Sequence, residues 1–214
     1  MLDINKLKAE FSDLYAGEAL AKLLTEYNFQ TVIDIGCGQG KHSTAFEKYG
    51  KTVTAVDYGC SVYYRRGIRR DVRLGDFNEM LFDDTYDCAW ASSILEHQLN
   101  VNLFLRKLFD VTKPGGVVCV SVPPLKHQIV GGHVTLWNTG LLLYNMVLAG
   151  FDCSKARAKT YGYQISVIVR RGKPINLPEL SYDSGDITLL LPYFPPGFRE
   201  GVNGNIADIR WGGT

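Results

Sequence analysis

The chain has 214 residues, of which 46% are hydrophobic and 21% are charged, and its formal net charge is +1. This size and composition fit one globular domain with a sizeable core. The small net charge gives no overall field that would favour nucleic acid or an anionic membrane, and no apolar run is long enough to span a bilayer.

The N-terminal residues "MLDINKLKAEF" carry charges throughout and lack the apolar core of a signal peptide. The five cysteines are odd in number and form no CxxC pair, and two of them lie within apolar runs. We therefore expect reduced, mostly buried thiols of a cytoplasmic protein. Neither a disulfide framework nor a metal site is expected. The cysteines are Cys37, Cys60, Cys88, Cys119 and Cys153.

Taken in chain order, the hydrophobic pattern predicts helices that alternate with strands. Apolar residues at helical spacing predict one or two amphipathic helices over residues 4–27, ahead of a first strand at 31–35. A continuous apolar run at 117–122 is typical of a strand buried on both faces. The other elements predicted are a helix at 41–50, strands at 51–57, around 71–74 and at 86–92, and helices at 102–112 (stopped by Lys113–Gly116) and 139–150.

Residues 153–171 predict two strands joined tightly at Tyr161 and Gly162. These strands must be antiparallel because no helix separates them. The chain is therefore expected to have an α/β fold, a three-layer Rossmann-like doubly wound sheet of seven mostly parallel strands with an antiparallel last strand and helices on both faces. We expect residues 1–172 to form this domain. Residues 173–214 form a loop-rich extension packed on it, because "ITLLLPYF" is too apolar to lie in water.

A glycine-rich turn follows the first strand in "TVIDIGCGQG", residues 31–40. Its glycines have the spacing G-x-G-x-G. A dinucleotide fingerprint would need a glycine at position 41, which is Lys41, and no G-K-[ST] follows to make a P-loop. In a doubly wound sheet the first such turn is a usual place for a ligand.

The segment "VIDIGCGQG" resembles motif I of the class I S-adenosylmethionine-dependent methyltransferases. The resemblance continues in order through an acid at the end of the second strand, "GDF" at 75–77, "YDCAWASSILEHQ" at 86–98 and "LFDVTKPGGVVCVSVP" at 108–123. It ends with the helix that closes on "AGF" and the final strand pair. It covers roughly residues 28 to 171.

The resemblance implies S-adenosylmethionine as the cofactor. It also implies that Asp57 accepts both ribose hydroxyls, since a carboxylate is an acceptor only, that Asp76 takes the adenine amine, and that Phe77 packs on the base. Taken singly, the two acids would be solvated loop residues and Phe77 an ordinary core aromatic. The implied cofactor-binding residues are Asp34, Gly36, Cys37, Gly38, Gly40, Asp57, Tyr58, Asp76, Phe77 and Ser92.

Methyl transfer to an oxygen of high pKa needs a base, and histidine is the usual one. His97 follows the fourth strand, in an "LEH" segment that is common in the family whatever the acceptor. His133 lies in the loop after the fifth strand, on the expected acceptor side. Both are candidate bases, and we favour His133. His42 is expected near the cofactor or in solvent, and His127 has no clear role.

The segment "YYRRGIRRDVR" favours a solvated helix face, but Arg65, Arg66, Arg69 and Arg70 would also suit recognition of an anionic acceptor. Enzymes that methylate amino groups of DNA bases carry an Asp/Asn-Pro-Pro-aromatic motif after the fourth strand. Here that place holds "ASSILEH", so we expect no nucleic-acid partner.

These patterns together predict a methyltransferase that modifies a small or carrier-linked acceptor, more readily at oxygen than at nitrogen. The "GGHVTLWN" region and the apolar tail faintly resemble methyltransferases encoded with bacterial surface-polysaccharide genes, which favours a sugar or glycan precursor. The alternatives are N-methylation of a small molecule and a non-catalytic protein that binds S-adenosylmethionine. The oligomeric state stays open.

Overall fold

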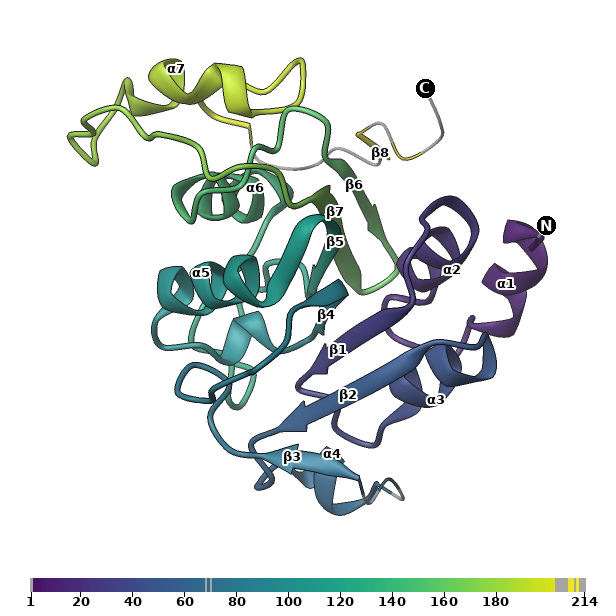
Figure 1. The fold of residues 1–214 in the computed structure, drawn as a ribbon. Coiled ribbons are helices and arrows are strands. Elements are labelled where there is room, and N and C mark those ends of the chain that lie inside the picture. The colour runs from purple at the N-terminus through teal and green to yellow at the C-terminus, as the bar shows by residue number, and fades with distance from the viewer. Residues whose placement is uncertain (1, 68, 70, 203–207, 210, 212–214) are drawn as a thin grey trace.

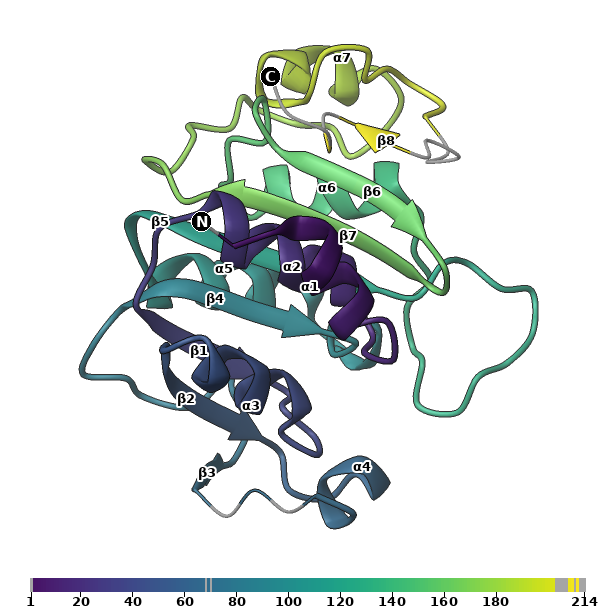
Figure 2. The ribbon, with the colours of Figure 1, turned by 90° about the vertical axis from the view of Figure 1, so that its right-hand side faces the viewer.

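The computed structural model describes residues 2–67, 69, 71–202, 208–209 and 211. They form an eight-stranded sheet in the order β3-β2-β1-β4-β5-β7-β6-β8, with helices packed on both faces. Figures 1 and 2 show the three layers from two directions, with β3 at one edge of the sheet and the C-terminal segment at the other.

The first six strands along the chain run in the same direction, and the seventh strand runs against them. β7 pairs antiparallel with both β5 and β6. The seven predicted strands and the reversed last one are therefore confirmed, and the C-terminal extension adds a two-residue eighth strand to the edge of β6. The strands are β1 (Thr31–Ile35), β2 (Thr52–Asp57), β3 (Val72–Leu74), β4 (Tyr86–Ser92), β5 (Thr112–Val122), β6 (Arg157–Tyr161), β7 (Gln164–Arg170) and β8 (Asp208–Ile209).

The prediction that Lys113–Gly116 separates a helix from the next strand is wrong. The strand β5 begins at Thr112, directly after helix α5 (Val101–Val111). The segment is drawn into the sheet because Gly115 N–H donates to the Arg171 carbonyl at 2.7 Å, and Arg171 N–H donates to the Gly116 carbonyl at 2.8 Å. Hydrogen bonds to Arg171, the residue after β7, thus outweigh the local preference of this segment for a turn.

The helices divide between the two faces because successive side chains of a strand point to opposite sides. Val32 of β1 and Trp90 of β4 pack with α1 (Ile4–Glu10), α2 (Gly17–Glu26) and α3 (Lys41–Lys48). Ile33 and Ala89, their neighbours in sequence, pack with α5 and α6 (Thr139–Leu148) on the other face. None of the helices described is long and apolar enough to cross a membrane.

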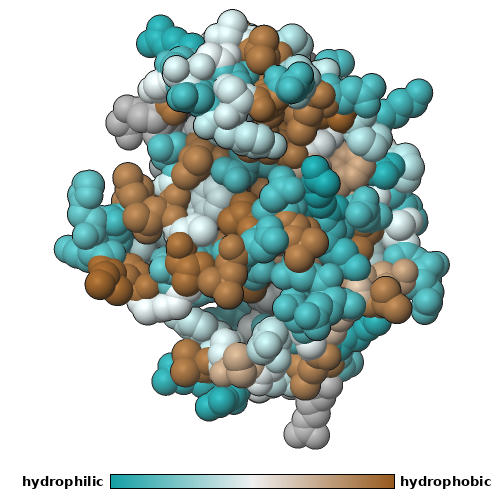
Figure 3. Space-filling model, turned by 90° about the vertical axis from the view of Figure 1, so that its left-hand side faces the viewer, coloured by the Kyte–Doolittle hydropathy of each residue, from teal (hydrophilic) through white to brown (hydrophobic). Residues whose placement is uncertain are grey.

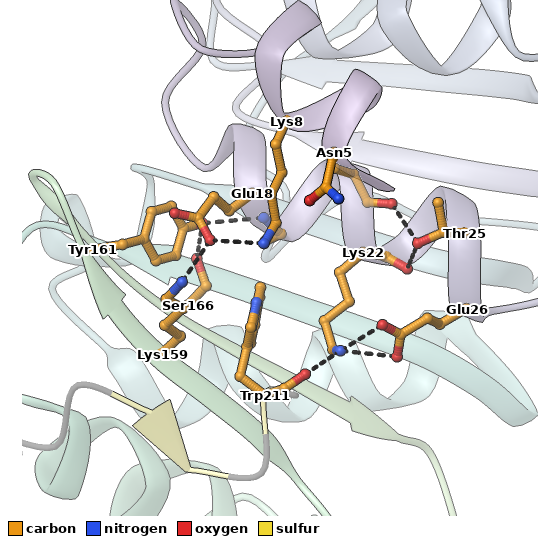
Figure 4. Close-up of polar contacts among 12 residues, drawn as sticks. Asn5, Lys8, Glu18, Lys22, Thr25, Glu26, Lys159, Tyr161, Ser166 and Trp211 are labelled. Atoms are coloured by element: carbon orange, nitrogen blue, oxygen red, sulfur yellow. Dashed lines mark hydrogen bonds and ion pairs between the residues drawn. The ribbon is translucent and has the colours of Figure 1, made fainter. Parts of the chain in front are cut away.

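Residues beyond 173 pack against both faces of the domain. The segment α7 (Asp186–Leu190) and the 3-10 turn η2 (Leu191–Tyr193) bring Leu190 and Phe194 into the core beneath α5 and α6. On the opposite face, Lys22 is 1% exposed and donates hydrogen bonds to the Trp211 carbonyl and to Glu26, the latter at 2.7 Å (Figure 4). Its ammonium group is thus surrounded by oxygen acceptors, as a buried charge requires.

Candidate functional site

The candidate site lies at the edge of the sheet where the parallel strands end. β1 lies between β2 and β4, so the end of β2 at Asp57 and the end of β4 at Ser92 flank the glycine turn that follows β1. This edge is where doubly wound sheets bind their ligands. The short helix α4 (Val62–Arg65) and the 3-10 turn η1 (Leu95–His97) also follow strands that end here.

The glycine turn is fastened to the end of β2 by its backbone. The amides of Gly36 and Cys37 both donate to the Val56 carbonyl, at 2.8 and 3.0 Å. Gly36, Gly38 and Gly40 have φ values of +73°, +52° and +75°, which glycine adopts far more readily than other residues. The spacing of the three glycines is therefore required by the shape of this turn.

The three glycines differ in what surrounds them. A Cβ on Gly36 would lie 2.9 Å from the Ile94 side chain, and one on Gly40 would lie 2.9 Å from Arg69. A Cβ on Gly38 would meet only the Cβ of Tyr63, at 3.4 Å. Packing within the protein accounts for Gly36 and Gly40, whereas Gly38 leaves room outside the turn for a ligand.

The carboxylate of Asp57 is held between two backbone amides. Its Oδ2 accepts from Gly38 N–H at 2.9 Å and its Oδ1 from Gly59 N–H at 2.8 Å, and the residue is 6% exposed. Each oxygen keeps a second lone pair, so the oriented carboxylate can still accept from a ribose diol. Tyr58, the next residue, is largely exposed.

Two residues assigned to the cofactor from the sequence lie behind the turn. Asp34 is buried and accepts from the Ser43 hydroxyl at 2.6 Å, so it joins β1 to α3. Burial raises its pKa, and the nearby His42 and Ser43 oppose that rise. Burial, assisted by the carboxylates of Asp34 and Asp57, raises the pKa of Cys37 to about 12, which keeps the thiol protonated. Their contact with a cofactor stays a prediction.

The "GDF" segment follows β3 at the same edge. The carboxylate of Asp76 accepts from Asn78 N–H at 2.9 Å, and the residue is partly exposed. Phe77 is 6% exposed and packs against Phe104 and Phe82, with ring centroids 5.2 and 5.8 Å apart. The structure thus places Phe77 in the core, where its ring supports the segment. Its contact with a base is untested.

At the end of β4, Ser92 is buried, and its Oγ has no hydrogen-bond partner within the described part of the chain. An unpaired buried hydroxyl invites a ligand partner. The open side of Gly38, the carboxylate of Asp57 and this hydroxyl lie at the ends of three adjacent strands. This set of acceptors and open backbone fits the ribose and amino-acid parts of S-adenosylmethionine.

Four arginines between β2 and β3 were candidates for binding an anionic acceptor. One of them, Arg69, is bound by acidic side chains of the protein itself. Its guanidinium forms ion pairs with Glu47 and Asp71 at 2.9 and 2.8 Å, and it covers Gly40. Arg65, the last residue of α4, and Arg66, the residue after it, are exposed. Arg70 lies outside the described residues. The structure favours a surface role for this segment, and contact with an acceptor stays untested.

The two candidate bases meet at the end of the site beside β4. The rings of His97 and His133 are edge to face, with centroids 5.0 Å apart. His97 Nδ1 donates to the Gly132 carbonyl at 2.6 Å, which fixes its tautomer, because a carbonyl only accepts. Burial, with His97 and Lys126 nearby, lowers the pKa of His133 and favours its neutral form. His42 instead contacts the Tyr15 carbonyl at 2.7 Å, and His127 is exposed.

Glu96 completes this cluster and is the residue that sequence reasoning missed. It is 1% exposed, and burial raises its pKa to about 7. Its backbone carbonyl accepts from the amides of Val134 and Thr135 at 2.9 and 3.3 Å, which fastens the loop bearing His133 to η1. The available signal was an acid that directly follows the apolar pair Ile94 and Leu95 and precedes His97.

The comparison with known proteins agrees with this geometry. The family described as "Methyltransferase domain" matches residues 33–120. The chain is 31% identical to the malonyl-[acyl-carrier protein] O-methyltransferase of Salmonella typhimurium over 50% of this chain and 44% of that protein. It is 32% identical to the ubiquinone biosynthesis O-methyltransferase of a Bradyrhizobium species over 49% and 44%. The alignments thus span less than half of either relative.

Among solved structures, the chain is similar to the Burkholderia thailandensis 1,6-didemethyltoxoflavin-N1-methyltransferase with bound 1,6-didemethyltoxoflavin and S-adenosylhomocysteine. The TM-score is 0.57 at 17% identity, covering 79% of this chain and 76% of that one. The identity is low, so this likeness concerns the fold. Residues 33–120 thus match the methyltransferase-domain family, and the chain shares the fold of class I S-adenosylmethionine-dependent methyltransferases.

Proposed function

We propose that this protein transfers the methyl group of S-adenosylmethionine to an oxygen of a small or carrier-linked acceptor, with a sugar or glycan-precursor hydroxyl as the leading class. One observation carries the proposal: His97, His133 and the buried Glu96 converge at the end of β4, beside the glycine turn. In this proposal the turn and Asp57 hold the cofactor, and the histidines receive the acceptor.

S-adenosylmethionine supplies an electrophilic methyl carbon bound to a positively charged sulfur. With the cofactor bound, the acceptor oxygen would form a bond to this carbon as the carbon–sulfur bond breaks, and the electron pair of that bond would stay on sulfur. The acceptor proton passes to a histidine and then to water. His133 suits this task because its lowered pKa keeps a ring nitrogen free to accept a proton near neutral pH.

The histidine pair favours oxygen over nitrogen as the methyl acceptor. A sugar hydroxyl has a pKa far above neutral, so it needs a base as the new bond forms. A neutral amine already carries a free electron pair and can react after alignment alone. A pair of histidines at the acceptor side therefore fits a hydroxyl acceptor, which needs a base, better than an amine acceptor.

The loop that carries His133 supports a carrier-linked acceptor. It projects beyond the strand ends in Figure 2, and its apolar side chains Leu125, Ile129, Val134 and Leu136 are exposed, Ile129 completely. On the face that bears α5 and α6, apolar side chains also interrupt the polar surface (Figure 3). Exposed apolar groups that gather near a site favour binding of an apolar partner. The Salmonella relative is named for a carrier-bound acceptor.

The proposal is tested by measuring acceptor-dependent release of S-adenosylhomocysteine. The panel contains nucleotide sugars, lipid-linked glycans, acyl-carrier thioesters, small phenols and small amines, and Gly38→Val serves as the cofactor-free control. We expect turnover with a hydroxyl acceptor and none with the control. Turnover confined to amines would replace the proposal by N-methylation. Tight cofactor binding without turnover on any of these acceptors would favour a non-catalytic binding protein.

A further inference from the structure

Three side chains at the acceptor end of the site have the composition of a metal centre. A carboxylate oxygen of Glu96 and one ring nitrogen each of His97 and His133 all lie within 4.8 Å of one another. Around an ion with bonds of about 2.0–2.2 Å, neighbouring ligand atoms lie roughly 3–3.5 Å apart. Small rotations of three side chains would therefore close the set around one ion.

The ring of His97 is already oriented as a ligand. Because Nδ1 donates to the Gly132 carbonyl, the free electron pair of the neutral ring is on Nε2, which lies 4.0 Å from Glu96 Oε1. Histidines that bind metals almost always donate their other ring N–H to a carbonyl, a carboxylate or water. Gly132 provides this support from the neighbouring loop.

Glu96 supplies a second, independent observation. It is 1% exposed, and its Oε2 has no hydrogen-bond partner among the residues that the structure describes. Buried carboxylates are paired with a charge or coordinate a metal, because an unpaired charge loses its hydration without compensation. The histidine ring at 4.0 Å is too distant to hydrogen bond to Glu96. A cation between the three side chains would satisfy the carboxylate.

The segments that bear these ligands are fixed to one another. Val134 and Thr135 donate their backbone N–H groups to the Glu96 carbonyl. Thr135 Oγ1 in turn accepts from Trp137 Nε1 at 3.0 Å, and Trp137 is buried in the core. The loop that bears His133 is therefore held close to η1, and most of the site is ordered before any ligand binds.

We propose that Glu96, His97 and His133 bind one divalent transition-metal ion such as Zn²⁺ or Co²⁺. Two imidazole nitrogens and one carboxylate suit these ions, whereas Mg²⁺ prefers oxygen ligands alone. Three protein ligands leave a position open, as in catalytic zinc sites. The binding rests on this geometry, and a part in turnover rests on the proposed function: the ion would hold the acceptor hydroxyl and lower its pKa, so that its proton leaves to water.

The test of binding uses the full chain without a polyhistidine tag, stripped by a chelator and titrated with Co²⁺. We expect one ion per chain and intensified visible absorption bands. His133→Ala and Glu96→Gln should each lower the affinity at least tenfold, since even supporting residues change metal affinity 10- to 100-fold. The matched control is His127→Ala, an exposed histidine of the same loop, which should bind as the wild type does. Circular dichroism verifies that each variant is folded.

Several results would overturn the site. These are no saturable binding of Co²⁺ or Zn²⁺ by the wild type, equal affinity in folded His133→Ala, an equal loss in His127→Ala, or Mg²⁺ competing as well as Zn²⁺. None of these readouts needs an acceptor, so they are independent of the proposed function. Once an acceptor is known, unchanged turnover in the chelated enzyme would remove the ion from the reaction and leave a histidine as the base.

Discussion

The backbone N–H of Gly38 donates to Asp57 Oδ2 at 2.9 Å, so the glycine turn after β1 and the acid that ends β2 form one unit. This contact aligns a carboxylate beside the only glycine of the three whose outer side is open. It couples the turn to Asp57, and substitutions at either residue should therefore act on the same ligand.

Asp57→Ala should weaken the binding of S-adenosylmethionine about 10- to 100-fold, because hydrogen bonds to a charged acceptor contribute roughly 1.5–3 kcal/mol and water replaces part of that loss. The variant also leaves the amides of Gly38 and Gly59 without their acceptor. Isothermal calorimetry measures the effect. Asp110→Ala, an exposed acid on α5, is the control. Unchanged affinity in Asp57→Ala would mean that this acid does not hold the ribose.

Gly38→Val should abolish cofactor binding in a folded protein. A side chain there would fill the space outside the turn, where only Tyr63 lies near. Gly50→Val is a matched control, since Gly50 also has positive φ, +73°, with nothing within 4 Å of a Cβ. Both changes introduce a similar backbone strain, about 1–2 kcal/mol, but only the first should affect the cofactor. Equal cofactor affinity in the two variants would show that the turn is purely structural.

Most of the sheet could be predicted from the sequence because its strands are buried on both faces and read as apolar runs between glycine turns. The run at Val117–Val122 is an example. Two features could not be predicted. The pairing of Gly115 and Gly116 with Arg171, 55 or more residues away, reverses a strong local turn signal. The eighth strand forms only because it pairs with β6, and a strand of two residues is too short to show a hydrophobic pattern in the sequence.

In the candidate site, too, local sequence predicts some residues, whereas others depend on contacts between distant segments. Its glycines and Asp57 could be predicted because local spacing defines them. Glu96 could not, since its importance arises from a loop more than thirty residues later that donates two backbone amides to its carbonyl. Phe77 is a different case: the motif predicts a contact with the cofactor, which stays untested, and the packing of its ring against Phe82 and Phe104 involves segments that follow it in the chain.

Asp87 should stabilise the fold at neutral pH and lose that effect in acid. Burial raises its pKa, but Lys113 and the amides of Thr31 and Gln30 lower it by more, so the pKa lies well below its usual range. A lowered native pKa gives stability that is present above the unfolded value, about 3.9, and is lost as pH falls through the native value.

Asp87→Ala should therefore lower the free energy of unfolding near neutral pH by about 1.5–3 kcal/mol, since it removes hydrogen bonds to a charged acceptor. Urea unfolding measured at neutral and at strongly acid pH checks this. The difference in free energy of unfolding between Asp87→Ala and the wild type should become smaller in acid. A gap independent of pH would show that the carboxylate charge is not responsible.

Trp211→Ala should destabilise the whole domain by about 3 kcal/mol, because a large buried aromatic is replaced by a cavity. Trp211 is buried against α2, with its ring 5.2 Å from Lys22 Nζ. Thermal unfolding measures the loss, and Leu189→Ala, a half-exposed residue of α7, is the control. A Trp211→Ala protein as stable as the wild type would mean that the extension is not part of the folding unit.

His133→Ala should lower turnover about 10²- to 10⁴-fold with cofactor affinity unchanged, which is the usual contribution of a positioned base. If the proposed ion takes part in turnover, the same change removes one of its ligands. His127→Ala, on the same loop but exposed, should keep full turnover. Single-turnover kinetics with the acceptor found by the panel provides the measurement. Near-normal turnover of His133→Ala would exclude this residue and favour an acceptor that reacts after alignment alone.

Gly131 and Gly132 are adjacent in the loop that bears His133, but they differ in backbone conformation and in what a methyl group would meet. A Cβ on Gly132 would lie 3.1 Å from His97 Nδ1, at a φ of +79°, whereas a Cβ on Gly131 would have nothing within 4 Å. Gly132→Ala should displace the His97 ring from the carbonyl that orients it. We expect kcat to fall at least tenfold while the affinity for S-adenosylmethionine is retained, because the cofactor is held by the turn and Asp57. Gly131→Ala should match the wild type in both measurements. Equal kcat in the two glycine variants would show that the orientation of His97 has no part in the reaction, and loss of cofactor affinity in Gly132→Ala would show that the loop shapes the cofactor site.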